Sequence, residues 1–154
     1  MSDTLTTEEA VNPLDLRRTA MNLLARREHS QRELSEKLSK RFAEPELIED
    51  VLVALADEGL QSDQRFAESF VRQRLSRGHG PLRLRQESRQ RGLSEEDLEA
   101  ALTAVEPDWF DLAERCYRKK FGATPAEDIK DKARRVRFMS YRGFSRDHYE
   151  HLID

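Results

Sequence analysis

The chain has 154 residues, of which 37% are hydrophobic and 37% are charged, with a formal net charge of −3. The charged share is well above the quarter that is usual for a globular domain, so several thin helical bundles are expected in place of one thick core. The longest apolar run, residues 51–56, is far too short for a membrane span, which needs roughly 20 residues, and the single cysteine excludes an internal disulfide. Because the first residues are polar and acidic, unlike a secretory signal, we expect a cytoplasmic protein.

Residues 1–13 are predicted to form a flexible tail, and apolar residues recur at helical spacing through the rest of the chain. No stretch alternates with a period of two, so the predicted fold class is all-α, with nine short helices. The expected helix starts are Asn12-Pro13, the capping box from Ser30 to Glu33, Gly80-Pro81, Ser94 and Thr124-Pro125. The expected helix stops are Gly59, Gly92 and Gly143.

The helical pattern repeats along the chain. RGLSEEDLEAAL (residues 91–102) matches RGFSRDHYEHLI (142–153), and FAESFVRQRL (66–75) resembles LAERCYRKKF (112–121). We therefore predict three tandem three-helix repeats, over residues 14–60, 61–106 and 107–154. Units this small bury little surface alone, so the repeats are expected to stack into an elongated, curved array. One irregular helical bundle is the alternative.

No pattern in the sequence predicts catalysis. His148 and His151 are three residues apart and could face one metal ion, but no third ligand is implied nearby. Cys116 lies in an apolar stripe and is predicted to be a core residue. The glycine-rich loops that bind nucleotide phosphates are missing from the sequence. We therefore expect no enzyme, no metal and no cofactor.

Basic residues cluster in two segments although the whole chain is acidic. Residues 72–91 hold seven arginines and one acid, and residues 115–142 hold ten basic and three acidic residues. Arginine suits phosphate and carboxylate groups alike, so these runs predict a positive surface for a polyanion or for an acidic protein groove. The alternative is a solvated face with local ion pairs, such as Asp131 with Arg135. The candidate binding residues are Arg72, Arg74, Arg83, Arg85, Arg89, Arg91, Lys119, Lys130, Arg134 and Arg137.

Three segments carry a more specific pattern: ARREHSQRELSEKL (residues 25–38), LQSDQRFAESFVRQRLSRGHGPLRLRQE (60–87) and RGLSEEDLEAAL (91–102). The most specific part is Asp63-x-x-Phe66-Ala67-x-x-Phe70-Val71-x-x-Arg74, followed by Gly78 and by the helix start Gly80-x-x-Arg83-Leu84. These segments resemble the RecX family, which regulates the bacterial RecA recombinase. The resemblance covers roughly residues 15 to 154 and is loosest in the third repeat.

The resemblance implies tandem three-helix repeats in a monomeric protein that binds RecA. It further implies that the protein lodges in the groove of the RecA filament on single-stranded DNA and limits filament extension, ATP hydrolysis and strand exchange, and with them DNA recombination, DNA repair and the SOS response. Weak non-specific DNA binding and no cofactor are expected from the same resemblance. Ser88 departs from the family, which usually has an apolar residue there. Because a buried hydroxyl needs a partner, weaker packing of the second repeat is expected.

Two other interpretations stay open at this point. A helix-turn-helix-like DNA-binding regulator would bind duplex DNA sequence-specifically and would form a dimer. A helical adaptor for some other partner would use its basic faces only for solubility.

Overall fold

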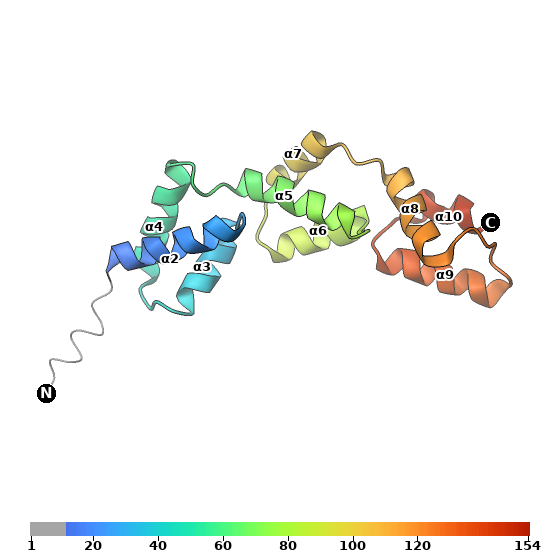
Figure 1. Ribbon diagram of the computed structural model, residues 1–154, viewed down its shortest axis with the longest axis horizontal. Coiled ribbons are helices and arrows are strands. Elements are labelled where there is room, and N and C mark those ends of the chain that lie inside the picture. The colour runs from blue at the N-terminus through green and yellow to red at the C-terminus, as the bar shows by residue number, and fades with distance from the viewer. Residues whose placement is uncertain (1–11) are drawn as a thin grey trace, which may run out of the picture. The chain divides into compact units, whose positions relative to one another are not determined.

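The structure is a computed structural model that describes residues 12–154. Within that range it contains nine helices and no strand, which confirms the all-α prediction (Figure 1). The helices are α2 (Pro13–Arg26), α3 (Gln31–Ser39), α4 (Pro45–Asp57), α5 (Asp63–Ser76), α6 (Pro81–Gln90), α7 (Glu95–Val105), α8 (Trp109–Phe121), α9 (Ile129–Tyr141) and α10 (Arg146–Ile153).

Helix α2 begins within the predicted tail. The side chain of Asn12 caps α2 by accepting a hydrogen bond from the Leu14 amide, and Pro13 is the first helical residue. Proline is favourable at this position because its missing N–H would have no partner inside the helix. Residues 12 and 13 therefore belong to the helix start, and the rest of the predicted tail lies outside the described residues.

The chain divides into two compact units, one that ends at Phe66 and one that runs from Ala67 to Asp154. Helices α2, α3 and α4 lie in the first unit. The second unit contains most of α5 and all of α6 to α10. Apart from residues 61–66, the segments predicted as the second and third repeats thus share one unit.

The first unit has one apolar core, to which each of α2, α3 and α4 contributes a stripe of residues spaced three or four apart. This spacing puts the stripe on one face of a helix. Each fully buried leucine or isoleucine contributes about 2 kcal/mol relative to an exposed one. The core residues are Leu16, Ala20, Leu34, Leu38, Ile48, Leu52 and Leu55.

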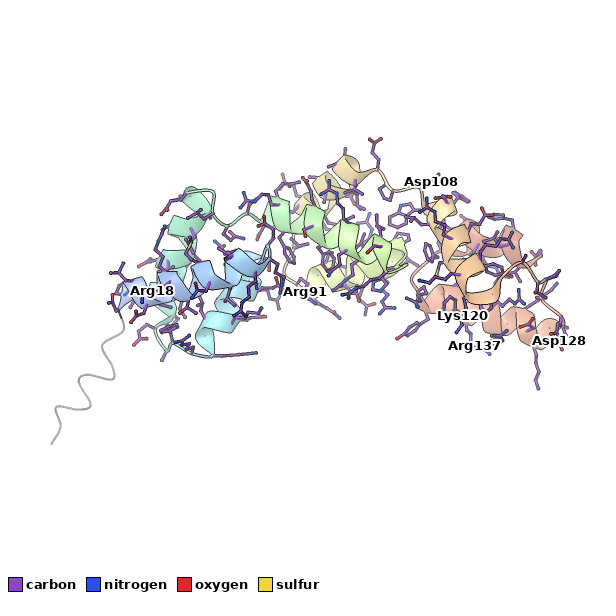
Figure 2. All side chains as sticks on the ribbon, viewed as in Figure 1. Arg18, Arg91, Asp108, Lys120, Asp128 and Arg137 are labelled. Atoms are coloured by element: carbon purple, nitrogen blue, oxygen red, sulfur yellow. The ribbon has the colours of Figure 1, made fainter. Side chains whose placement is uncertain are left out.

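The third repeat has a core of its own, formed by Ala113, Tyr117, Met139, Phe144, Tyr149 and Ile153. Cys116 is only partly buried and packs at the edge of this cluster, so the prediction of a core cysteine holds only in part. Figure 2 shows Asp108 and Asp128 at the starts of α8 and α9, where their carboxylates cap the helices by accepting from the amides of Asp111 and Asp131.

Most of the predicted helix boundaries are confirmed, but Thr124-Pro125 is not a helix start. Helix α9 begins four residues later, at Ile129. The reason lies in the buried Arg135, whose guanidinium donates to the Thr124 carbonyl oxygen at 2.8 Å and to the Tyr117 hydroxyl at 2.7 Å. A buried guanidinium needs such acceptors, and a helix starting at Pro125 would not offer this carbonyl to it.

Candidate functional site

The arginines of α6 have acidic partners. Arg85 makes two ion pairs with α7, to Glu95 at 3.0 Å and to Glu99 at 2.6 Å. Arg89 lies 3.9 Å from Glu95, and Arg83 lies 3.3 Å from Glu87. The contacts of Arg85 and Arg89 tie α6 to α7, and the Arg83–Glu87 pair lies within α6. Together they compensate much of the charge that the sequence assigns to an open basic surface. The local ion pairs that the sequence left as the alternative are therefore present here.

Arg74 is buried, so its charge is not presented to solvent. Only 7% of the residue is exposed, and its Nε lies 2.9 Å from Glu87 Oε1. Burial lowers the pKa of Arg74, and Glu87 opposes this shift. Burial also raises the pKa of Glu87, but His79, Arg74 and Arg83 outweigh it, so that this pKa lies below its ordinary value. Arg74 therefore belongs to the packing of α5 on α6 and is left out of the candidate surface.

The remaining residues of the middle run are less enclosed. Arg72 is exposed and lies 3.9 Å from Glu68 on the same helix. Arg91, just after α6, is half-buried. Ser88 is buried in α6, but its hydroxyl donates to the Arg85 carbonyl oxygen at 2.9 Å, so it has the partner that a buried hydroxyl needs.

The basic stripe on α9 is exposed. Lys130, Arg134 and Arg137 follow one another at spacings of four and three residues, which puts them on one face. Arg134 pairs with Asp131 at 2.7 Å. Lys130 and Arg137, the latter labelled in Figure 2, make no ion pair with any described residue. They are the more available charges on this face.

A backbone junction joins the second and third repeats. The amide of Gly80 donates to the Arg142 carbonyl oxygen at 2.7 Å, and the amide of Leu82 donates to the Gly143 carbonyl oxygen at 2.9 Å. Pro81 has no N–H to satisfy, and Gly80 provides no side-chain cap for α6. Carbonyls at the end of α9 thus take the place of an N-cap, with the negative end of one helix facing the positive end of the other.

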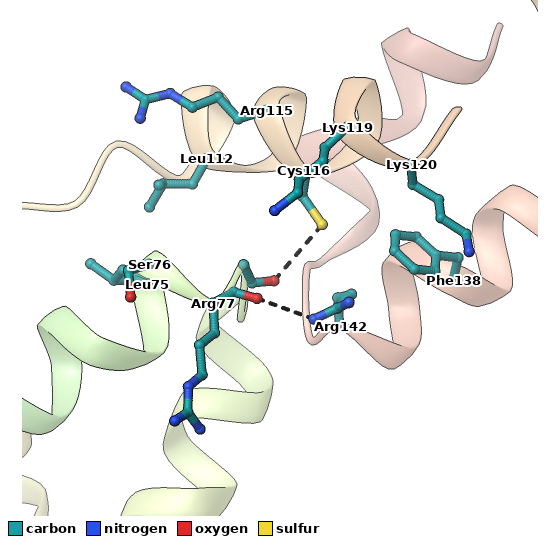
Figure 3. A pocket seen from close by; sticks show the side chains of 11 residues that line it. Leu75, Ser76, Arg77, Leu112, Arg115, Cys116, Lys119, Lys120, Phe138 and Arg142 are labelled. Carbon is teal, nitrogen blue, oxygen red and sulfur yellow. Dashed lines mark hydrogen bonds between the residues drawn. The ribbon is translucent and has the colours of Figure 1, made fainter. Parts of the chain in front are cut away.

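Beside this junction lies a cleft of about 450 Å³ (Figure 3). It is lined by the end of α5 and the turn after it, by α8, and by the end of α9 and the turn that follows. Two bonds cross beneath it: the Arg142 guanidinium donates to the Arg77 carbonyl oxygen at 3.1 Å, and the Cys116 thiol lies 3.8 Å from the Gly78 carbonyl oxygen. The lining residues are Leu75, Ser76, Arg77, Gly78, Leu112, Arg115, Cys116, Lys119, Lys120, Phe138 and Arg142.

Of the ten candidate binding residues, only Lys119 lines this cleft. The cleft's other four cations were not among the candidates: Arg77, Arg115, Lys120 and Arg142. All four lie in the two basic runs of the sequence, and Arg142 opens the repeated Arg-Gly-apolar-Ser pattern. That pattern recurs between the second and third helices of the second and third repeats, at residues 91–94 and 142–145, and it is the sequence signal nearest to the cleft.

The histidines near the C-terminus contact aromatic rings. The His148 ring lies 5.1 Å from that of Phe110 and 6.5 Å from that of Trp109, and the His151 ring lies 6.4 Å from that of Phe110. Residues 12–154 contain no group of three or more metal-ligating side chains placed to hold an ion. Over the same range, no helix has the length and apolar character to cross a membrane.

Three family models match the chain in order. They describe the first, second and third three-helix domains of RecX and match residues 17–55, 62–102 and 106–148. A regulatory protein RecX of Pseudomonas putida (strain GB-1) is 46% identical over 92% of this chain and 90% of its own length. The chain belongs to the RecX family. RecX of Pseudomonas tolaasii is 48% identical over 90% of this chain and 89% of its own length. These relatives are named regulatory proteins and not enzymes, in agreement with the sequence prediction.

Solved RecX structures share the fold. A crystal structure of RecX from Lactobacillus salivarius matches with a TM-score of 0.71 and 20% identity, over 91% of this chain and 93% of that chain. A second crystal structure, of a regulatory protein RecX, matches with a TM-score of 0.77 and 22% identity, over 98% of this chain and 76% of that chain. The fold class of three tandem RecX three-helix domains is thereby confirmed.

Proposed function

We propose that this RecX-family protein is a cytoplasmic regulator that binds RecA and its filament on single-stranded DNA. It inhibits filament extension, ATP hydrolysis and strand exchange, and so restrains recombination and the SOS response. The observation that carries the proposal is the match of three RecX domains in order, together with 46% identity to a regulatory protein RecX over nearly the whole chain.

The distribution of charge supports a binding role without catalysis. Lys119 in the cleft and Lys130 and Arg137 on α9 are cations without ion-pair partners among the described residues. Such separate charges give many modest contacts along a polyanionic or acidic surface in place of one deep pocket. A monomer bound along a filament would block subunit addition by occupying the surface that the next subunit needs. Non-specific DNA binding by the same cations would be weak and sensitive to salt.

RecA's hydrolysis of ATP on single-stranded DNA tests this function, with the protein added well below one copy per RecA. We expect strong suppression, because a regulator that stops filament growth acts on many subunits at once. The protein with the same DNA but without RecA is the control. Suppression only at saturating protein, matched by DNA binding in the control, would indicate competition for DNA. A discrete footprint on duplex DNA would instead favour the helix-turn-helix alternative.

A charge-reversed variant tests whether the α9 face contributes. Lys130→Glu with Arg137→Glu is expected to weaken inhibition by about tenfold, since reversing two rim charges removes attraction and adds repulsion. Lys132→Glu is the matched control: Lys132 is also exposed on α9, but at 100° per residue it lies roughly opposite Lys130. Equal inhibition by both variants would exclude the α9 face from the contact.

A further inference from the structure

The cleft beside the junction of the second and third repeats combines five cations with an apolar floor. We propose that it binds an acidic peptide segment of a partner protein, with one bulky apolar side chain of that segment seated on Leu75, Leu112 and Cys116. The proposal rests on the proposed function only in taking the partner to be a protein. It specifies the kind of surface that this part of the regulator would bind.

The positive charge of the cleft is complementary to carboxylate groups. None of its lining residues is acidic. Arg77 and Lys119 make no ion pair with any described residue, and Arg115 pairs only with the half-buried Asp111 on its own helix, at 2.7 Å. In Figure 3 the guanidinium groups of Arg115 and Arg77 extend away from the cleft on opposite sides, while Lys119 lies beside Cys116. Cations spread in this way suit several carboxylates along an extended segment better than one small anion.

The floor of the cleft accepts an apolar group. Leu112 points from α8 toward the end of α5, where Leu75 lies, and Cys116 lies one turn further along α8 (Figure 3). These side chains are only partly buried by the protein itself. The volume of about 450 Å³ lies within the range of pockets that hold a specific ligand. Covering this floor with an apolar side chain would add the hydrophobic contribution that charge alone does not supply.

A nucleic acid strand fits the cleft less well than a peptide does. Bases bind single-strand sites by stacking on aromatic rings, and Phe138 is the only aromatic residue in the lining. Its ring already has the Lys120 ammonium at 5.4 Å, the Arg142 guanidinium at 5.2 Å and the Phe121 ring edge-on at 5.4 Å. A base has no free aromatic face here, whereas carboxylates can meet the cations and an apolar side chain can meet the floor.

The cleft is formed before any ligand arrives. Arg142 is fixed by its bond to the Arg77 carbonyl oxygen, and the amides of Gly80 and Leu82 hold the end of α9 in place. A preformed site loses little conformational entropy when it binds, so a short peptide can bind measurably.

Cys116 provides a site-specific probe, because it is the only cysteine of the chain and lies on the cleft floor. The rate at which iodoacetamide alkylates it in the full-length protein would be measured at mildly alkaline pH, since burial raises the pKa of this thiol against the opposing effects of Arg142 and Lys119. The ligand is a twelve-residue peptide of aspartate and glutamate with one central phenylalanine. The controls are the same peptide with alanine at the centre and a twelve-nucleotide oligothymidine.

Saturating phenylalanine peptide is expected to slow alkylation at least fivefold, and the alanine peptide and the oligothymidine are expected to leave the rate nearly unchanged. Unchanged alkylation with the phenylalanine peptide would overturn the proposal. So would equal protection by the alanine peptide, which would show that the floor is not used, or by oligothymidine, which would assign the cleft to nucleic acid.

A variant pair tests the charged part of the site by fluorescence anisotropy of the labelled phenylalanine peptide. Lys119→Glu is expected to weaken binding at least tenfold, and Lys132→Glu, outside the cleft, is expected to leave it unchanged. Equal peptide affinities for the two variants would contradict the assignment, provided that both have wild-type circular dichroism. Since RecA is absent from these assays, failure of peptide binding with intact inhibition of RecA would remove the cleft proposal and leave the proposed function standing.

Discussion

His29 is buried in a setting that holds its ring neutral. Its Nδ1 lies 3.1 Å from the Arg27 carbonyl oxygen, and its Nε2 lies 3.0 Å from Lys37 Nζ. An ammonium group can only donate, so Nε2 accepts and the single ring proton sits on Nδ1. Burial lowers the pKa of His29, and the charges of Arg27 and Lys37 lower it further, against the Arg27 carbonyl and Glu33.

This neutral histidine predicts that stability falls on mild acidification. With a folded-state pKa below the unfolded value of about 6.5, the contribution is complete above that pH and is lost as the pH falls through the folded-state pKa. The free energy of unfolding in urea is expected to decrease by about 1 kcal/mol between pH 7.5 and pH 5. In His29→Gln this decrease should be smaller. Part of the decrease should remain, because burial also lowers the pKa of His79. His151→Gln, at an exposed histidine, is the control. If both variants lose as much stability between pH 7.5 and pH 5 as the wild type does, the assignment of the effect to His29 is refuted.

Single residues were predictable from sequence where their partners are close in the chain. The capping box of Ser30 and Glu33 forms as predicted, because both members lie within one turn. The environment of Arg85 was not predictable, since its partners Glu95 and Glu99 come from the next helix. The burial of Arg74 was not predictable either. Its helix face and its partner Glu87 emerge only when α5 and α6 pack.

The junction of α6 with α9 depends on two glycines. A β-carbon on Gly80 would collide with the backbone of Gly143, and one on Gly143 would collide with the Cβ of Arg83 and lie 2.6 Å from its amide nitrogen. Gly143 also has a φ of +95°, which side chains with a β-carbon rarely adopt. The close approach of the two helix ends is possible only because neither residue carries a side chain.

Gly143→Ala is therefore expected to destabilise the protein by about 3 kcal/mol, from steric overlap in addition to an unfavourable φ. The matched control is Gly59→Ala: Gly59 has a φ of +77°, but an added β-carbon there meets nothing within 4 Å. Gly59→Ala should lower the free energy of unfolding by only about 1 kcal/mol, the cost of placing a residue with a β-carbon in the left-handed region. Urea unfolding followed by circular dichroism would measure both. Equal losses of stability would mean that the junction is not close-packed.

Helix boundaries were predictable where local signals act alone. Gly80-Pro81 and Ser94 start helices as expected, because a proline or a capping hydroxyl acts within the first turn. Thr124-Pro125 carries the same kind of signal and starts no helix, because the buried Arg135 uses the Thr124 carbonyl. The demand of a buried charge for acceptors outweighs a local start signal, and a local pattern does not reveal which charges become buried.

For the molecule as a whole, the three repeats were predictable and the grouping of two of them was not. Self-similarity between residues 91–102 and 142–153 indicates the repeats, and three family models match in order, over residues 17–55, 62–102 and 106–148. Residues 67–154 form one compact unit through backbone bonds such as Gly80 to Arg142. Backbone donors and acceptors are the same for every sequence, so composition and periodicity do not report such a junction.

The cations of α9 and the arginines of α6 should differ in what they contribute to the proposed DNA binding, because Arg85 and Arg89 are already ion-paired. Oligothymidine binding would be followed by fluorescence at a series of salt concentrations, without RecA. If Lys130 and Arg137 contact phosphates, changing both to glutamine should reduce the slope of log affinity against log salt by about 1.4, since each phosphate contact on a single strand contributes about 0.7. Arg85→Gln with Arg89→Gln should reduce it by much less, because these arginines would have to leave Glu95 and Glu99 to reach a phosphate. The reverse order of effects would show that ion pairing with α7 does not remove the α6 arginines from the DNA-binding surface.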